Sequence, residues 1–249
     1  MKTIAITSHI ASKQHRLNEV YSRAFTSDTT IPIIIPIPEF NFNELSTDSH
    51  YRRIEELSNK VVQISDALVL SGGNDINPVT FDRENRNSRE TDFRRDTFEL
   101  ELIEKFIKAE KPVMGICRGF QLLGFYAGLM DFKTDLDYKD TEWELHNAKT
   151  MDFSKRTEPA HQVMIMNDFE KWIKEKGFNT DTILVNSLHH QGFTATRKNS
   201  KRVEIRARTS SLIEGFRFYK SPVVAFQYHP EEYEDSLTIQ YIMEKYINV

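Results

Sequence analysis

The sequence predicts an α/β fold with a mostly parallel central sheet, helices on both faces, and extra strands in the C-terminal half. Three observations favour this fold. Strand-like apolar runs alternate with helix-period runs over the first half of the chain, as in parallel sheets with crossover helices. A cysteine flanked by glycines, Cys117, stands at a strand-to-helix turn. Five more strand-like runs follow in the second half.

The first half reads as a strand and helix repeat. Strands are predicted at 3–7, 31–37 and 66–71, and helices at 16–25, 51–64 and 91–110. Each helical segment places apolar residues three and four positions apart, so that they share one face. Pro32 and Pro36 cannot donate to a strand ladder. They therefore confine the second strand to a sheet edge, or to its first and last pairings.

The second half is richer in strand signals. Its predicted strands lie at 163–166, 182–185, 203–208, 212–218 and 223–228, and a closing helix lies at 237–247. Residues 131–160 are charged and weakly periodic, and they predict loops and short strands. Because neither a repeat nor a linker divides the sequence, we expect a single domain over residues 1–249.

Composition narrows the class of protein. The 249 residues carry a net charge of −4 and no Lys/Arg-rich block, so nucleic acid is not an expected partner. No window approaches 18 apolar residues, and the N-terminal apolar run is too short for a signal peptide, so we expect no membrane association. The single cysteine excludes an internal disulfide. This fits a reducing, cytoplasmic setting, and neither a cofactor nor a metal site is predicted.

Residues 111–123 contain the most informative motif. A short apolar run reaches Cys117 and a helix-period run leaves it, with Gly115 and Gly119 two positions to either side. Such glycines relieve crowding at a tight elbow that presents a nucleophile. A helix N-terminus favours the thiolate, and the amide of Arg118 is free to donate to an oxyanion. The alternative is a buried structural cysteine, which most lone cysteines are.

A second motif, His229-Pro230-Glu231, follows the last predicted strand. Residues two apart in an extended segment face the same way, so the carboxylate of Glu231 can lie beside the imidazole of His229. Together with Cys117, these residues would supply a nucleophile, a base and an acid that orients the base, as in a catalytic triad. The Gly72-Gly73 turn after the third strand is a candidate second oxyanion donor, although such a turn alone is usually only a turn.

Six blocks of the sequence resemble, in order, those of class I glutamine amidotransferase-like γ-glutamyl hydrolases, especially the γ-glutamyl-γ-aminobutyrate hydrolase type: Leu70–Phe81, Arg95–Glu99, Gly115–Leu123, Val185–Gln191, Ile213–Phe216 and Phe226–Glu231. The resemblance implies that Cys117 attacks a γ-glutamyl amide, with His229 as acid and base and Glu231 orienting it. It also implies oxyanion donors at the Gly73 and Arg118 amides. The implied substrate contacts are Gly72, Gln121, Ser187, His189, His190 and Gln191.

The chain departs from the family after the elbow. The usual Gln-Leu-Leu-Asn and Gly-Gly-x-Leu are replaced by Gln121-Leu-Leu-Gly124 and Ala127-Gly-Leu-Met130, and residues 131–160 match poorly. These segments help to shape the leaving-group side, so the sequence does not name the amine.

The predicted function is cysteine-dependent hydrolysis of a small-molecule γ-glutamyl amide through a thioester. One alternative is a glutaminase subunit that delivers ammonia to a separate synthetase. Another is a non-catalytic relative, which the intact Cys117, His229 and Glu231 disfavour. A homodimer and a synthetase are the protein partners left open.

Overall fold

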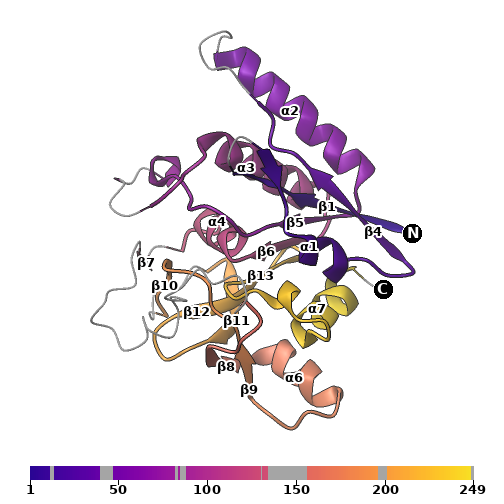
Figure 1. Ribbon diagram of the computed structural model, residues 1–249, viewed down its shortest axis with the longest axis vertical. Helices are drawn as coiled ribbons and strands as arrows, with labels where there is room; N and C mark the ends of the chain where they lie inside the picture. Colours follow the sequence, from indigo (N-terminus) through magenta and orange to yellow (C-terminus); the bar gives the residue numbers. More distant parts are fainter. Residues whose placement is uncertain are drawn as a thin grey trace.

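A nine-stranded mixed sheet organises the molecule (Figure 1). The computed structural model describes residues 1–11, 14–39, 47–81, 84, 88–129, 131–133, 156–195 and 201–247. Most of the predicted loop segment 131–160 therefore lies outside the described residues.

The sheet order is β4-β1-β5-β6-β13-β12-β11-β8-β9. Its parallel core consists of β4 (Thr30–Ile35), β1 (Lys2–Thr7), β5 (Ala67–Leu70), β6 (Val113–Ile116) and β13 (Val223–Phe226). The antiparallel extension consists of β12 (Ile213–Phe218), β11 (Val203–Arg208), β8 (His161–Ile165) and β9 (Thr182–Val185). The predicted α/β fold is confirmed. The extra C-terminal strands continue the same sheet, which makes it mixed as a whole.

Helices cover both faces of the sheet, as predicted. On one face lie α2 (Thr47–Ile64), α3 (Phe93–Lys108) and α4 (Arg118–Tyr126), and on the other lie α1 (Glu19–Ala24), α6 (Asn167–Glu175) and α7 (Leu237–Ile242). A π turn, Met243–Ile247, prolongs α7. In β1 the buried Ala5 packs toward the first group, while Ile4 and Ile6 pack toward the second. This alternation is the period-2 pattern of a strand buried on both sides.

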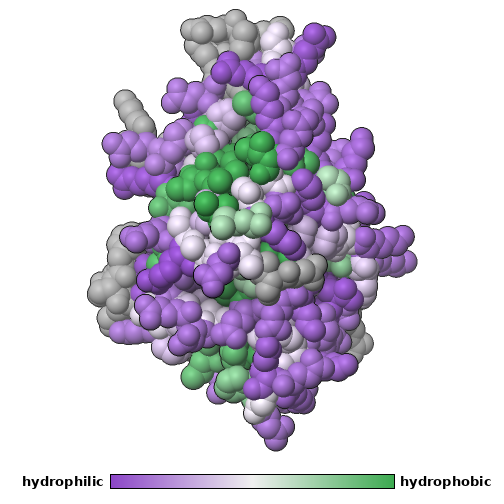
Figure 2. All heavy atoms as spheres, turned by 90° about the vertical axis from the view of Figure 1, so that its right-hand side faces the viewer, coloured by the Kyte–Doolittle hydropathy of each residue, from purple (hydrophilic) through white to green (hydrophobic). Residues whose placement is uncertain are grey.

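Strand β4 lies at an edge of the sheet, in agreement with Pro32 inside the strand and Pro36 directly after it. Figure 2 looks onto that side of the molecule, where apolar side chains gather. Ile31 and Ile34 of this strand are about half exposed, at 47% and 54%. None of the helices in the described ranges is long and apolar enough to cross a membrane.

The structure differs from the sequence prediction most at the first helix and at α6. The helix predicted at 16–25 begins only at Glu19, because Gln14–Arg16 pairs with His9–Ala11 as the hairpin β3/β2. Helix α6 was not predicted. Its cap residue, Met166, makes no side-chain cap hydrogen bond, although Asn167 with Glu170 three positions later is a usual start signal.

The remaining elements are short. A 3₁₀ turn, η1, covers Pro78–Phe81, and another, η3, covers Pro230–Glu232. Strand β7 (Phe132–Lys133) pairs with β10 (Gly192–Phe193) in a separate two-stranded sheet.

Candidate active site

The elbow between β6 and α4 holds Cys117 in a strained backbone conformation. Its φ of 53° and ψ of −103° lie outside the regions that side chains usually adopt. Such strain costs about 1–3 kcal/mol and persists only where the surroundings enforce it. Here close packing around the elbow holds Cys117 in this conformation. A Cβ at Gly119 would lie 2.2 Å from the Leu70 carbonyl oxygen, and one at Gly115 would lie 2.6 Å from the Gly119 oxygen. Only glycines allow α4 to pack this tightly against the sheet.

His229 reaches the same edge from the neighbouring strand. Strand β13 pairs with β6 in parallel, with Phe226 opposite Ile116, so the chain ends that follow both strands lie side by side. The two side chains meet at Gly72. A Cβ built there would lie 3.0 Å from His229 Cε1 and 3.5 Å from Cys117 Cβ. The structure therefore brings together the predicted cysteine, histidine and Gly72.

The carboxylate of Glu231 holds the imidazole of His229. His229 Nδ1 lies 2.7 Å from Glu231 Oε1, and both side chains are buried. Burial alone would lower the pKa of His229, but the charges of Glu231 and Cys117 outweigh it and raise the pKa to about 10. The arrangement thus favours an imidazolium beside the sulfur at neutral pH, which is the form that can protonate a leaving group.

Asn186 fixes the backbone of His229. Its Oδ1 accepts the His229 N–H at 2.9 Å, and its Nδ2 donates to the His229 carbonyl oxygen at 3.0 Å. Asn186 follows β9, the far edge strand of the antiparallel half. A residue distant in sequence therefore sets the position of the candidate base.

Two backbone amides are available as oxyanion donors. Gly73 has φ of 128°, a conformation that favours glycine, and its N–H donates no hydrogen bond within the described ranges. The Arg118 N–H belongs to the first turn of α4, where amides have no intrahelical acceptor. By contrast, the Gly72 N–H is already bound, because it donates to the Tyr21 hydroxyl at 2.8 Å. Gly73 and Arg118, the predicted pair, remain suitable.

A buried ion network lies beneath these donors. The Arg118 guanidinium contacts the carboxylates of Asp96 and Glu99, and Arg95 Nε donates to Glu99 Oε1 at 2.9 Å. Arg95 Nη2 also donates to the Ser71 carbonyl oxygen at 2.9 Å. Although burial disfavours the charge of Glu99, the two guanidinium groups outweigh it and lower the pKa of Glu99. The network therefore ties the loop that carries Gly73 to the helix start that carries Arg118.

The other predicted contact residues join two loops beside the site. His190 Nε2 lies 3.0 Å from Asp75 Oδ2, and Gln191 Nε2 donates to Ser88 Oγ at 3.1 Å. Gln121 Nε2 donates to the Gln191 carbonyl oxygen at 3.1 Å. The same oxygen lies 2.9 Å from Nδ1 of the buried His189. Ser187, in the same loop, is also buried.

Donor atoms of His229, Glu231 and Glu232 lie within 4.8 Å of one another. These groups have other uses, however. Glu231 binds the His229 ring, and Glu232 pairs with Arg156 Nε at 2.5 Å. A metal ion would have to displace both contacts, so these contacts explain the cluster better than a metal site does.

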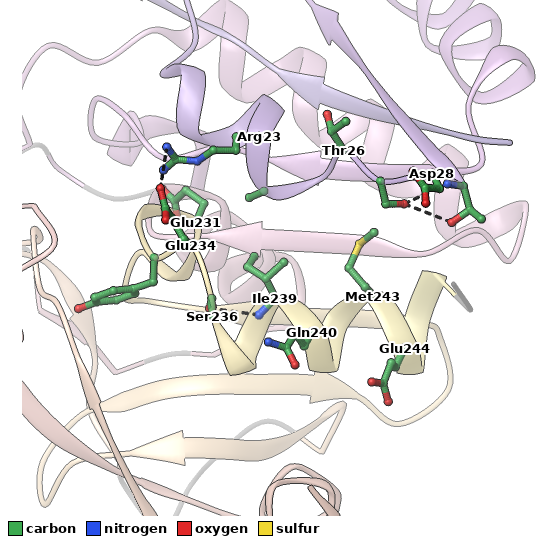
Figure 3. Close-up of a pocket in the computed structure, with 14 residues that line it drawn as sticks. Arg23, Thr26, Asp28, Glu231, Glu234, Ser236, Ile239, Gln240, Met243 and Glu244 are labelled. Carbon is green, nitrogen blue, oxygen red and sulfur yellow. Dashed lines mark hydrogen bonds and ion pairs between the residues drawn. The ribbon is translucent and has the colours of Figure 1, made fainter.

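A groove of about 590 Å³ opens between α1 and α7 (Figure 3). Glu231 contributes to its wall, together with residues such as Arg23, Asp28 and Gln240. Neither Cys117 nor His229 lines it. The groove therefore lies beside the triad acid and is not the place where a bond would be cleaved.

Comparison with known proteins identifies the family. The sequence model described as Peptidase C26 matches residues 2–231. The chain belongs to the Peptidase C26 family. This confirms the resemblance to γ-glutamyl hydrolase-type, class I glutamine amidotransferase-like proteins.

Two curated relatives of this C26 chain match most of its length. Protein NtpR of Enterococcus hirae is 30% identical over 207 residues, which cover 81% of this chain and 75% of NtpR. The glutamine amidotransferase-like protein YvdE of Lactococcus lactis is 29% identical over 187 residues, which cover 72% of this chain and 71% of YvdE. A glutamine amidotransferase structure from Thermotoga maritima superimposes with a TM-score of 0.56 at 16% identity, covering 99% of this chain and 83% of that one. At that identity it shows the shared fold alone.

Sequence reasoning missed the residues that position the site. Asn186 and Arg95 lie inside blocks that resemble the family, but nothing local shows what they touch. The four-residue spacing of Arg95 and Glu99 was an available signal, because such pairs meet on one helix face. Tyr21 gave no such signal, since it reads as an apolar residue of an amphipathic helix.

Proposed function

We propose that this C26 chain hydrolyses a γ-glutamyl amide, releasing glutamate and an amine through a γ-glutamyl thioester. The observation that carries the proposal is the buried His229–Glu231 pair, 2.7 Å apart, beside the strained elbow cysteine. Its chemistry is that of a nucleophile, an acid/base and an orienting acid. A setting that keeps the single thiol reduced, such as the cytoplasm, suits this mechanism.

The first half-reaction forms the thioester. The Cys117 thiolate attacks the γ-carbonyl carbon, and the resulting oxyanion accepts the Gly73 and Arg118 N–H groups. His229, as imidazolium, donates its proton to the departing nitrogen while the C–N bond breaks. The amine leaves, and the glutamyl group stays on sulfur.

The second half-reaction releases glutamate. His229, now neutral, removes a proton from water, and the oxygen attacks the thioester carbonyl. The C–S bond breaks, and the sulfur leaves as thiolate beside the regenerated imidazolium. Glu231 keeps Nδ1 of the ring occupied throughout, which leaves the other ring nitrogen for proton transfer.

The joined loops support a hydrolase that works without a partner. The contacts His190–Asp75 and Gln191–Ser88 already connect the two loops beside the site. A glutaminase subunit that serves a synthetase is the second candidate, because the relative YvdE of Lactococcus lactis carries the name glutamine amidotransferase-like protein. Such a subunit gains by staying slow until its synthetase is present, since free ammonia would be wasted.

A hydrolysis screen of the purified chain tests the proposal, with γ-glutamyl amines, glutamine and Cys117→Ala as the control. We expect a kcat/KM for one γ-glutamyl amine at least about tenfold above that for glutamine, because each methylene-sized leaving-group contact supplies about 1–3 kcal/mol. If only glutamine is cleaved, and only after a synthetase is added, the second candidate is correct. If none of these amides is cleaved under either condition, both candidate functions are wrong.

A further inference from the structure

Tyr21 lies where the triad and the oxyanion loop meet, and the mechanism above gives it no role. Its hydroxyl accepts the Gly72 N–H at 2.8 Å. A Cβ at Gly72 would lie 3.1 Å from that hydroxyl and 3.0 Å from His229 Cε1. Tyr21 is buried, and its helix α1 packs against the η3 turn that carries Glu231. Figure 3 shows this turn beside α1.

Glu231 has an unused acceptor. Oε1 serves His229, whereas Oε2 is buried and accepts no hydrogen bond within the described ranges. A buried carboxylate oxygen without a donor is costly, and most such atoms in proteins find one. The site is therefore short of one donor at this oxygen.

The hydroxyl proton of Tyr21 is available for a hydrogen bond. Its oxygen is used as an acceptor by Gly72, and its O–H is still available to donate. Burial, followed by the negative charge of Glu231, raises the pKa of Tyr21 well above its usual range. The phenol thus keeps its proton, and it lies close enough to Glu231 for the carboxylate charge to act on it.

We propose that Tyr21 is a positioning residue that donates its O–H to Glu231 Oε2 while accepting the Gly72 N–H. It would then join the acid of the triad to the loop that presents the Gly73 amide. The Glu231 half of this role is the hydrogen bond to Oε2, and it concerns the triad geometry alone. The Gly72 half is the contact with the oxyanion loop, and it rests on the proposed hydrolysis. The two halves call for separate readouts.

The Glu231 half is tested without substrate, by the rate at which iodoacetamide alkylates the only cysteine of the chain. Alkylation proceeds through the thiolate, so its rate is sensitive to the position of the His229 ring beside the sulfur. Tyr21→Phe should slow alkylation at pH 7 by about threefold to tenfold, because Glu231 without this donor holds the His229 ring less firmly beside the sulfur. In a Glu231→Gln background the same change should slow it less than about twofold, since coupled residues are not additive. An equal factor in both backgrounds overturns the contact.

The Gly72 half is tested by steady-state hydrolysis. Tyr21→Phe should lower kcat by about 10–10²-fold, because a displaced oxyanion donor costs less than the 10²–10³ of a deleted one. KM should stay within about threefold, since the amide acts mainly in the transition state. An unchanged kcat overturns this half.

Tyr228→Phe is the matched control. Its hydroxyl also makes one buried contact, at 3.0 Å to Thr238 Oγ1 of α7, away from the oxyanion loop. Both Phe variants conserve volume, and thermal unfolding should show similar small losses of stability. Only Tyr21→Phe should change alkylation and kcat, and a similar change in Tyr228→Phe would overturn the specific role of Tyr21. If the wild type hydrolyses no γ-glutamyl amide, the proposed function fails while the alkylation coupling still decides the contact with Glu231.

Discussion

The two sides of the candidate site are held by different forces. On the cysteine side, the Arg118 side chain is paired with two buried carboxylates, Asp96 and Glu99. On the histidine side, the backbone of His229 is held by neutral hydrogen bonds from Asn186. The charged contact there, between His229 and Glu231, is itself part of the proposed chemistry.

Stability and proton transfer therefore reside on different sides of the site. A buried ion network tolerates the loss of no member, because each loss strands an opposite charge. Neutral hydrogen bonds each contribute only about 0.5–1.5 kcal/mol and can be lost one at a time. The cysteine side thus fixes the strained elbow, while the histidine side keeps a group whose charge changes within the proposed reaction.

The largest effect should come from removing the base. His229→Ala should lower kcat by about 10²–10⁴-fold, the usual contribution of general acid/base catalysis, while the protein stays folded. Glu231→Gln should cost less, because Glu231 orients and polarises the ring without transferring the proton. Steady-state rates with unfolding curves check this ranking. Equal activity of His229→Ala and wild type would remove His229 from the mechanism.

A change in the ion network of the cysteine side should lower the free energy of unfolding. Arg118→Leu keeps the backbone amide but strands Asp96 and Glu99, so it should cost about 3–5 kcal/mol in the free energy of unfolding. Urea denaturation measures the loss. Arg94→Leu is the control, because it breaks a more exposed pair with Asp92, whose side chains are 31% and 18% exposed. That pair should contribute about 1 kcal/mol or less. Similar losses in both variants would refute the assignment of stability to the network.

A smaller loss is expected from the neutral contacts of the histidine side. Asn186→Ala removes the two hydrogen bonds to the His229 backbone and should cost about 1–3 kcal/mol of unfolding free energy. The activity of the folded fraction should also fall, since the base is less well placed. Urea denaturation and rate measurements on the same samples separate the loss of stability from the loss of activity. A loss as large as that of Arg118→Leu would erase the contrast between the two sides.

The smallest effect concerns pH. The pKa of His229 is raised to about 10, so its charged form persists below that pH and is lost as the pH rises through it. Any stability from this charge is complete below the ordinary pKa of about 6.5 and disappears as the pH rises through the folded value. Accordingly, kcat should change by less than about twofold from pH 7 to 9, and then fall. A tenfold loss per pH unit above 6.5 would indicate an ordinary histidine.

Local patterns were sufficient for the parallel core and for the elbow. Strand and helix periodicity predicts the parallel core, and Gly115 and Gly119 around Cys117 predict the elbow. The structure then adds the physical reason, which is the contact of Gly119 with Leu70. The hairpin at 9–16 carries no Gly, Pro or Asn turn signal, whereas helix α6 has a start signal, Asn167 with Glu170, that the prediction did not use.

The supporting residues of the site depend on tertiary contacts. Tyr21 reads as an apolar helix residue, and only the packing of α1 on η3 brings its hydroxyl to Gly72. Asn186 and His229 are 43 residues apart. No spacing rule links such positions, so a single sequence indicates the reacting groups more readily than the groups that hold them.

The most direct test of the account is to trap the thioester. The protein is quenched with acid during incubation with the γ-glutamyl amide preferred in the hydrolysis screen, and intact and peptide mass spectra are recorded. We expect one γ-glutamyl group on the peptide that contains Cys117, and neither adduct nor turnover in Cys117→Ala. Continued hydrolysis by Cys117→Ala at the wild-type rate would contradict it.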